Sequence, residues 1–230
     1  MSIHEGEKMK KSLIFILLAL ILLGIIACSG GSKDKMIVKY DVELSMVRKA
    51  SDITQRYQAP VADTIDVVRY AYEDDLFRSI WSASEGGWDL VLYNKSERPL
   101  MIDWDEVSYI DVDNIGHSVL SSSTKYSERN EPQTPSVIPR RGNITERLFS
   151  ATHIYQSSTG EWAKRPLWPI DFSEAQRYKG KTVRLIIPFS VDGLTAQYEF
   201  NFTIKDVRQE AASSNPWQLF ILDRDLGVNL

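Results

Sequence analysis

The fold class is decided by the stretch from Val183 to Ile204, VRLIIPFSV-DG-LTAQYEFNFTI. Two runs of β-forming residues flank Asp192-Gly193, a pair that readily takes the positive φ angles of a tight hairpin turn. In the second run apolar side chains alternate with polar ones, and a period of two places them on one face: Tyr198, Phe200, Phe202 and Ile204. The stretch therefore predicts an antiparallel hairpin with one buried face.

Further short β-rich runs lie on the N-terminal side of this hairpin. Polar residues at 95–99 and at 113–116 separate neighbouring runs, so each of these turns predicts another hairpin. The runs are 36–44, 65–81 (which contains β-rich stretches), 88–94, 100–104, 106–112, 118–120 and 143–149. No long stretch shows a helical period with caps, which favours an all-β protein.

Three features define the edges and connections of this β-rich region. Pro188 cannot donate a hydrogen bond to a neighbouring strand, so it predicts an edge or a bulge in its run. The three prolines of 132–141 predict an extended loop, and 51–59 reads as a weak helix or a loop. About eight strands joined by turns predict an antiparallel β-sandwich over residues 36–210, followed by a C-terminal extension at 211–230.

The N-terminus carries an export signal. Residues 13–27 hold fifteen amino acids without a charge, which is short for a membrane span, and Lys10 and Lys11 precede them. This segment resembles the bacterial lipoprotein signal with its lipobox, which Ile25, Ala27 and Cys28 match position by position. The resemblance implies that residues 1–27 are a signal-peptide helix that is removed and that Cys28 is lipidated. The alternative is a short membrane helix with an incidental cysteine.

The lipoprotein resemblance also predicts a location. Residues 28–35 would form the lipidated cysteine and a flexible polar tether, which holds the protein to a membrane of the bacterial cell envelope. Gly30 stands where an aspartate retains such proteins in the inner membrane, so the resemblance favours the outer membrane. Several acyl chains together anchor a protein stably, whereas one chain binds only marginally.

The order of four motifs resembles that of a group of uncharacterised exported bacterial lipoproteins. These motifs are Asn94-Lys95-Ser96, Ile102-Asp103-Trp104-Asp105, Tyr109-Ile110-Asp111 and Pro135-Ser136-Val137-Ile138-Pro139. The resemblance spans about residues 70–205 and implies an immunoglobulin-like domain. It implies no activity and no catalytic residues.

Signals for catalysis or metal binding are weak. Residues 175–182 fit a loose phosphate-loop pattern but precede a predicted strand, whereas that loop requires a helix after it. Asp111 and Asp113 resemble the start of a calcium loop, but Ile115 occupies a ligand position, which favours a turn. Asp103 and Asp105 would share the solvated face of a strand beside a buried Trp104. His117 and His153 are too few for a zinc site and favour surface positions.

Two tryptophans stand out as candidate ligand contacts. Trp162 and Trp168 lie in the proline-containing stretch 160–172 with Lys164 and Arg165. Exposed aromatic rings on a loop would suit a glycan or a peptide. The alternative is a loop that folds back and buries both rings.

Composition limits the functional classes. The chain has 230 residues, of which 43% are hydrophobic and 10% aromatic, which excludes a disordered protein. Its net charge of −4 argues against nucleic-acid binding, and its single cysteine excludes a disulfide scaffold. We therefore expect a non-enzymatic, lipid-anchored envelope protein without cofactor or metal, whose partner is an envelope protein or a glycan.

The alternative function is an envelope hydrolase or a glycan-active enzyme whose site the sequence does not reveal. No Gly-x-Ser-x-Gly motif is present. A structure that places His117 or His153 beside a serine and a carboxylate in a cleft would favour this alternative.

Overall fold

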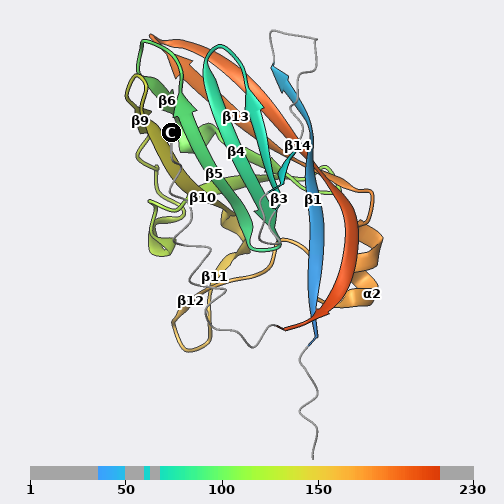
Figure 1. Ribbon diagram of the computed structural model, residues 1–230. Helices are drawn as coiled ribbons and strands as arrows, with labels where there is room; N and C mark the ends of the chain where they lie inside the picture. Colours follow the sequence, from blue (N-terminus) through green and yellow to red (C-terminus); the bar gives the residue numbers. More distant parts are fainter. Residues whose placement is uncertain (1–35, 50–59, 63–67, 213–230) are drawn as a thin grey trace, which may run out of the picture. The chain divides into compact units, whose positions relative to one another are not determined.

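The computed structural model describes residues 36–49, 60–62 and 68–212 (Figure 1). Residues Ile37–Glu210 form one compact unit, here called the β unit, and Met1–Met36 with Ala211–Leu230 are assigned to a second. The predictions for the signal peptide, Cys28, the tether, residues 51–59 and nearly all of the C-terminal extension lie outside the described residues.

The described chain is all-β and antiparallel, as the sequence predicts. Its strands are β1 (Met36–Lys49), β2 (Pro60–Ala62), β3 (Val68–Glu73), β4 (Phe77–Ser84), β5 (Gly87–Asn94), β6 (Leu100–Ile102), β7 (Ser108–Ile110), β8 (Gly116–Ser121), β9 (Ser136–Ile138), β10 (Asn143–Ser150), β11 (Ile154–Gln156), β12 (Trp162–Lys164), β13 (Thr182–Val191) and β14 (Leu194–Ala211). Short helical turns are η1 (Trp104–Glu106), η2 (Tyr126–Glu128), η3 (Ala151–His153), α2 (Phe172–Ala175) and η4 (Gln176–Tyr178).

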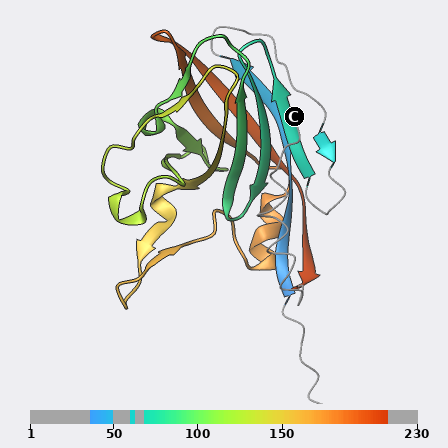
Figure 2. The same ribbon diagram turned by 60° about the vertical axis from the view of Figure 1, so that its left-hand side comes forward.

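One 12-stranded sheet nearly closes on itself (Figure 2). Its order is β1-β14-β13-β7-β8-β10-β5-β4-β3-β2, while β6 pairs with β13 and β9, and β11 and β12 form a separate hairpin. The first half of β8 pairs with β7 and its second half pairs with β10. Strand β8 therefore joins two halves of the sheet that face each other.

The hairpin of Val183–Ile204 is confirmed. Strands β13 and β14 pair from Thr182↔Thr203 to Val191↔Leu194, and Asp192 and Gly193 between them have φ angles of 50° and 79°. The four alternating apolar side chains of β14 are all fully buried. The turn sequence and the period of two were therefore sufficient to fix this pairing.

The prediction for Pro188 needs correction, because β13 is an interior strand. On the side away from β14, residues 184–186 pair with β7 and residues 189–190 pair with β6. Pro188 lies in the gap between these two partners, where no N–H donor is required.

The predicted hairpin around residues 95–99 is wrong. Strand β5 pairs with β4 and β10, whereas β6 pairs with β13 and β9, so the chain crosses from one half of the sheet to the other. The turn at 113–116 does form a hairpin, in which Tyr109 pairs with His117. The predicted loop at 132–141 contains the short strand β9.

The interior is filled by aromatic side chains from the two halves. Trp81 of β4 lies 4.8 Å from Phe200, and Trp88 of β5 lies 6.3 Å from Phe202, between ring centroids. Trp104 is fully buried as predicted, but it stands on η1 and not on a strand. Asp103 caps that helical turn by accepting a hydrogen bond from the backbone N–H of Asp105, so the predicted shared strand face of the two aspartates is wrong.

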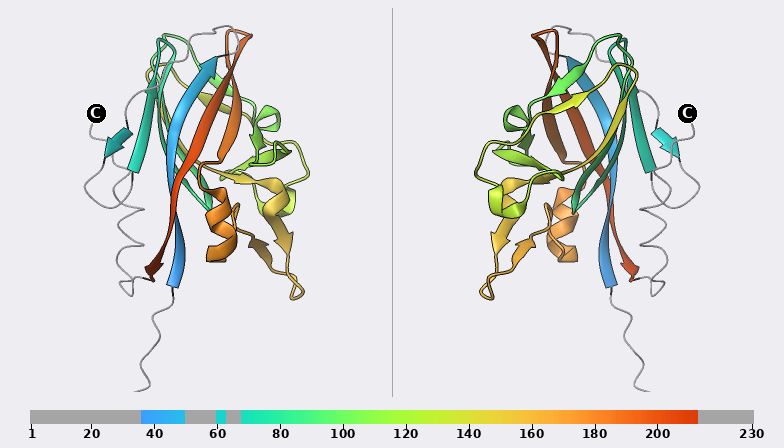
Figure 3. Two further views of the ribbon diagram at one scale, coloured as in Figure 1. Left: turned by 90° about the vertical axis from the view of Figure 1, so that its right-hand side faces the viewer. Right: turned by 90° about the vertical axis from the view of Figure 1, so that its left-hand side faces the viewer.

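The β unit has two ends, formed by different turns and loops (Figure 3). At one end, called the tip, the β13–β14 turn meets the turns at 95–99 and 139–142, and Arg98 pairs with Asp192 at 3.5 Å. At the other, called the entry end, lie the start of β1, the β4–β5 turn, α2 and the β11–β12 hairpin (Figure 1). Here the hydroxyl of Tyr40 donates to the carbonyl of Pro169 at 2.6 Å.

Candidate functional site

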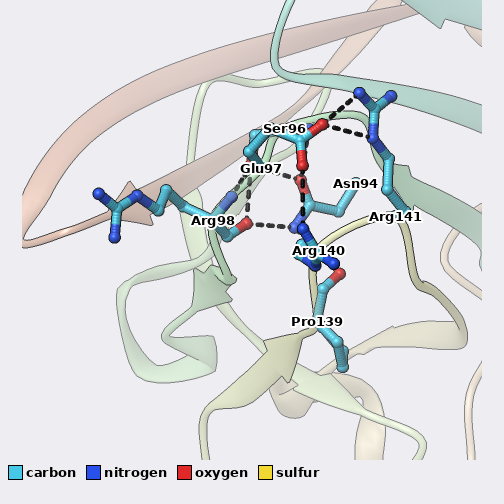
Figure 4. Close-up of polar contacts among 7 residues, drawn as sticks. All are labelled: Asn94, Ser96, Glu97, Arg98, Pro139, Arg140 and Arg141. Carbon is cyan, nitrogen blue, oxygen red and sulfur yellow. Dashed lines mark hydrogen bonds and ion pairs between the residues drawn. The ribbon is translucent and has the colours of Figure 1, made fainter.

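The tip is organised by one buried amide, that of Asn94 (Figure 4). Its Nδ2 donates to the carbonyls of Arg98, Ile138 and Pro139 at 2.7–3.1 Å, which ties the 95–99 turn to the end of β9. Its Oδ1 accepts hydrogen bonds from the backbone N–H and the hydroxyl of Ser96. This arrangement explains why the Asn-Lys-Ser turn moves the chain to a new partner strand and does not reverse it.

Three arginines surround this turn. Glu97 pairs with Arg140 at 3.3 Å and with Arg141 at 2.5 Å (Figure 4). Arg98 pairs with Asp192 of the β13–β14 turn. Hydrogen bonds and the positive charge of Arg141 lower the pKa of Glu97, so this carboxylate stays ionised. The arginines are therefore held in place while they remain at the surface.

Exposed apolar side chains lie on the strands that meet at the tip. Met101 of β6 pairs with Val137 of β9 on one side and with Ser190 of β13 on the other. Val137 is 59% exposed, Met101 39%, and Leu194, just after the β13–β14 turn, 80%. Exposed apolar side chains beside ordered arginines are typical of surfaces that bind other proteins.

At the entry end, cations stack on aromatic rings of the β11–β12 hairpin. The Arg129 guanidinium lies 4.6 Å from the centre of the Trp162 ring, and that of Arg165 lies 4.7 Å from Tyr155. Trp162 is partly buried and packs against a small core of Leu120, Phe149 and Ile154. Most of these neighbours are distant from Trp162 along the chain, so no local pattern in the sequence indicates them.

The two predicted ligand-contact tryptophans have different environments. Trp168 is only 2% exposed and its ring lies 5.0 Å from that of Tyr40, so it belongs to the main core. For Trp168 the fold-back alternative therefore holds, because a ring buried against Tyr40 cannot contact a ligand. Trp162 keeps part of its ring at the surface and remains a candidate contact residue.

The structure gathers both histidines around one hydroxyl group. His117 lies within hydrogen-bonding distance of Asp111 through Nε2 (2.9 Å) and of the Thr152 hydroxyl through Nδ1 (3.1 Å). The Thr152 oxygen also lies 3.0 Å from the Ser150 hydroxyl and 3.4 Å from Nδ1 of His153. A neutral His117 that donates through Nε2 to the carboxylate presents a lone pair on Nδ1 to Thr152.

Electrostatics keep the partners of this cluster in different charge states. Burial raises the pKa of Asp111, but hydrogen bonds from His117 and from two backbone amides outweigh burial and lower the pKa overall. Burial, His117 and Arg165 lower the pKa of His153, which favours its neutral form. Neither histidine is an isolated surface residue, in contrast to the sequence prediction, because both lie with Asp111, Ser150 and Thr152 in one group, here called the His117 cluster.

A groove of about 570 Å³ lies on the outer surface at the gap beside Pro188. Its lining includes Asp105, Glu106, Thr195 and Gln197, and Asp105 accepts a hydrogen bond from the backbone N–H of Gln133. The His117 cluster does not line this groove.

The phosphate-loop and calcium-loop matches in the sequence correspond to turns in the structure. Residues 175–182 end a helix and precede β13, which is the reverse of the order that a phosphate loop requires. Oδ1 of Asp111 accepts hydrogen bonds from the backbone N–H groups of Asp113 and Ile115, so this carboxylate already closes the turn. Among residues 36–49, 60–62 and 68–212, no group of three or more potential metal ligands is present.

Comparisons with protein-family models, with curated proteins and with solved structures give no match. None of the helices in the described ranges is long and apolar enough to cross a membrane.

Proposed function

We propose that this protein is a lipid-anchored protein of the bacterial cell envelope with a non-enzymatic binding role. The lipobox resemblance at Ile25, Ala27 and Cys28 supports lipidation of Cys28, and Gly30 favours the outer membrane. The order of the motifs between residues 94 and 139 supports membership of the exported lipoproteins that it resembles. The two facing halves of the sheet, joined through β8, support an immunoglobulin-like sandwich as the finer description of the fold.

The observation that carries the binding role is the tip. Its exposed apolar residues Leu194, Val137 and Met101 lie beside arginines that ion pairs already order. Because the interior is filled with aromatic rings, contact with a partner takes place on the outer surface. A preordered surface loses little conformational entropy on binding. An envelope protein suits this surface better than a glycan, because the exposed apolar side chains of the tip are aliphatic and not aromatic.

Affinity capture of the intact lipoprotein from its own envelope tests this role. We expect Leu194→Asp to remove a partner that the wild-type protein retains, because a charge replaces an exposed apolar contact. Ile115→Asp is the matched control, since Ile115 is 56% exposed but lies on the β7–β8 turn. Equal recovery of every partner by the wild-type protein and the Leu194→Asp variant would refute binding through the tip.

A hydrolase is the second candidate function, and the cluster of Asp111, His117 and Thr152 favours it. A hydroxyl, a base and a carboxylate that orients the base are the three parts of an activated nucleophile. In such a reaction the Thr152 oxygen would bond to an acyl carbon, its proton would pass to Nδ1 of His117 and then to the leaving alcohol, and water would release the acid.

Hydrolysis of a p-nitrophenyl ester by the purified full-length protein tests this candidate. The hydrolase hypothesis predicts turnover that Thr152→Val and His117→Gln abolish and that Ser158→Ala, at an exposed hairpin serine, leaves unchanged. Turnover that all variants share would reject it.

A further inference from the structure

The first strand of the β unit, β1, begins at the entry end beside Trp168 and Pro169. Tyr40, near the start of β1, donates a hydrogen bond to Pro169 and packs against Trp168. Met36, the first residue of β1, follows Cys28 by eight positions. At full extension this tether spans about 28 Å, and as a flexible chain its average reach is about 16 Å.

This reach decides which end of the β unit can approach the lipid anchor. Strand β1 has 14 residues, which cover about 45 Å from Met36 to Lys49 at the usual rise per residue. The Nζ of Lys49 lies over the ring of Tyr198, which is still several residues from the β13–β14 turn. A tether of about 28 Å cannot place the tip on the bilayer that holds Cys28, but it can place the entry end there.

The entry end carries side chains that suit a bilayer surface. Ile170 is 70% exposed, and Trp162 and Tyr155 are partly exposed on the β11–β12 hairpin. Trp and Tyr side chains concentrate at the level of lipid headgroups, where their rings meet the apolar boundary and their polar atoms meet water. The hairpin turn, residues 157–160, is Ser-Ser-Thr-Gly and carries no charge.

The entry end carries both basic and acidic residues, and the basic residues at the β11–β12 hairpin favour contact with phospholipid there. Arg129 and Arg165 lie on the aromatic rings of the hairpin, and Glu161 is the acidic residue of the hairpin. The Nζ of Lys164 on β12 is already engaged, because it donates to the carbonyl of Gly86 and lies over the ring of Phe149. Asp171 and Glu174 add negative charge at α2. Long basic side chains can place their charge among phosphate groups while their apolar stems cover the surface.

We propose that the β11–β12 hairpin and Ile170 rest on the phospholipid surface that holds the acyl chains of Cys28, so that the tip points away from the membrane. This inference rests on the proposed lipid anchor. A short flexible tether gives a local concentration in the millimolar range, so a contact with a Kd of about 1 mM is already substantially occupied. The exposed parts of Ile170 and of Trp162 and Tyr155, which lie on opposite faces of the hairpin, therefore need to supply only a weak contact.

The test uses the single cysteine of the chain. In the mature lipoprotein Cys28 would carry lipid, so Thr159→Cys on the hairpin turn and Leu194→Cys at the tip each add one thiol for a fluorescent label. Both positions are exposed. Each labelled full-length lipoprotein is reconstituted into vesicles of phosphatidylethanolamine and phosphatidylglycerol, with and without brominated chains that quench nearby fluorophores.

We expect brominated lipid to reduce the emission of the label at position 159 by roughly two-fold, as expected for a contact occupied about half the time or more. The label at position 194 should keep its emission. Trp162→Gln combined with Ile170→Ser should restore emission at position 159, whereas the control Ile115→Ser should not. Equal quenching at both positions, or stronger quenching at position 194, would overturn the proposed orientation.

Two further readouts distinguish a missing lipid anchor from a hairpin that binds glycan. Failure of the protein to float with the vesicles, together with no lipid mass on Cys28, would overturn the lipid anchor and the orientation with it. If purified envelope glycan changes the emission at position 159 and brominated lipid does not, the hairpin binds glycan and the bilayer contact is wrong.

Discussion

Replacing Asn94 by alanine is expected to destabilise the protein strongly, because this one side chain joins three segments at the tip. The amide is fully buried and donates to the carbonyls of Arg98, Ile138 and Pro139 while it accepts two hydrogen bonds from Ser96. Alanine fills the space of the Cβ atom alone and leaves the carbonyl of Ile138 and the N–H of Ser96 without these partners.

The structure gives the size of this effect. A buried polar group that loses its hydrogen-bond partner costs about 1–3 kcal/mol. The Asn94 amide is the partner of at least two such groups, one bonded to its Nδ2 and one to its Oδ1. The free energy of unfolding should therefore fall by about 3 kcal/mol. For a folded unit of this size that corresponds to a decrease of roughly 6–12 °C in Tm.

Urea denaturation followed by tryptophan fluorescence measures this change. Asn143→Ala is the matched control, because Asn143 is exposed on β10 next to the same turn, and it should change stability by less than about 0.5 kcal/mol. The reasoning is refuted if Asn94→Ala costs no more than Asn143→Ala. An unchanged m-value in both variants would show that the midpoints report stability and not a change in compactness.

Three further predictions concern separate regions. Gly87→Ala should cost about 2–4 kcal/mol in urea denaturation, because Gly87 has a φ of 134° and a Cβ there would collide with the carbonyl oxygen of Leu148. Gly180→Ala, at a φ of 80° with open space around it, should cost only about 1–2 kcal/mol, and equal losses would contradict the collision. The lowered pKa of His153 means that its contribution to stability is present above pH 6.5 and is lost as the pH falls through the folded-state value. Wild-type protein should therefore lose more stability between pH 7 and pH 5 than His153→Gln does, and parallel curves would refute this. The Arg129→Ala change should expose the Trp162 ring to water, which red-shifts the tryptophan emission slightly and increases its quenching by iodide. Iodide quenching equal to that of the wild-type protein would refute the stacking.

Local patterns in the sequence were enough to predict part of the fold. The β13–β14 hairpin followed from Asp192-Gly193 and from the alternation that ends at Ile204, both of which act between neighbouring residues. The turn at 95–99 looked equally like a hairpin, but the amide of Asn94 bonds to Ile138 and Pro139, more than forty residues further along the chain. No pattern within the turn indicates those partners, so the sequence could not show that the chain crosses there from one half of the sheet to the other.

The same limit applies to the candidate surfaces. Trp162 was recognisable as a candidate, but its partner Arg129 and its burial against Phe149 depend on tertiary contacts. Thr152 carried no signal of its own, because its neighbour His117 lies on β8, 35 residues earlier. The tip was equally hard to predict, since Val137 and Met101 become neighbours only when β6 pairs with β9.

Mass spectrometry of the N-terminus of the mature protein tests the proposed lipid anchor on Cys28. The purified protein is expected to begin at residue 28 and to carry acyl chains there, and Cys28→Ser should leave an uncleaved precursor that a fatty-acid probe does not label. An unmodified Cys28 in a protein that retains residues 13–27 would contradict it.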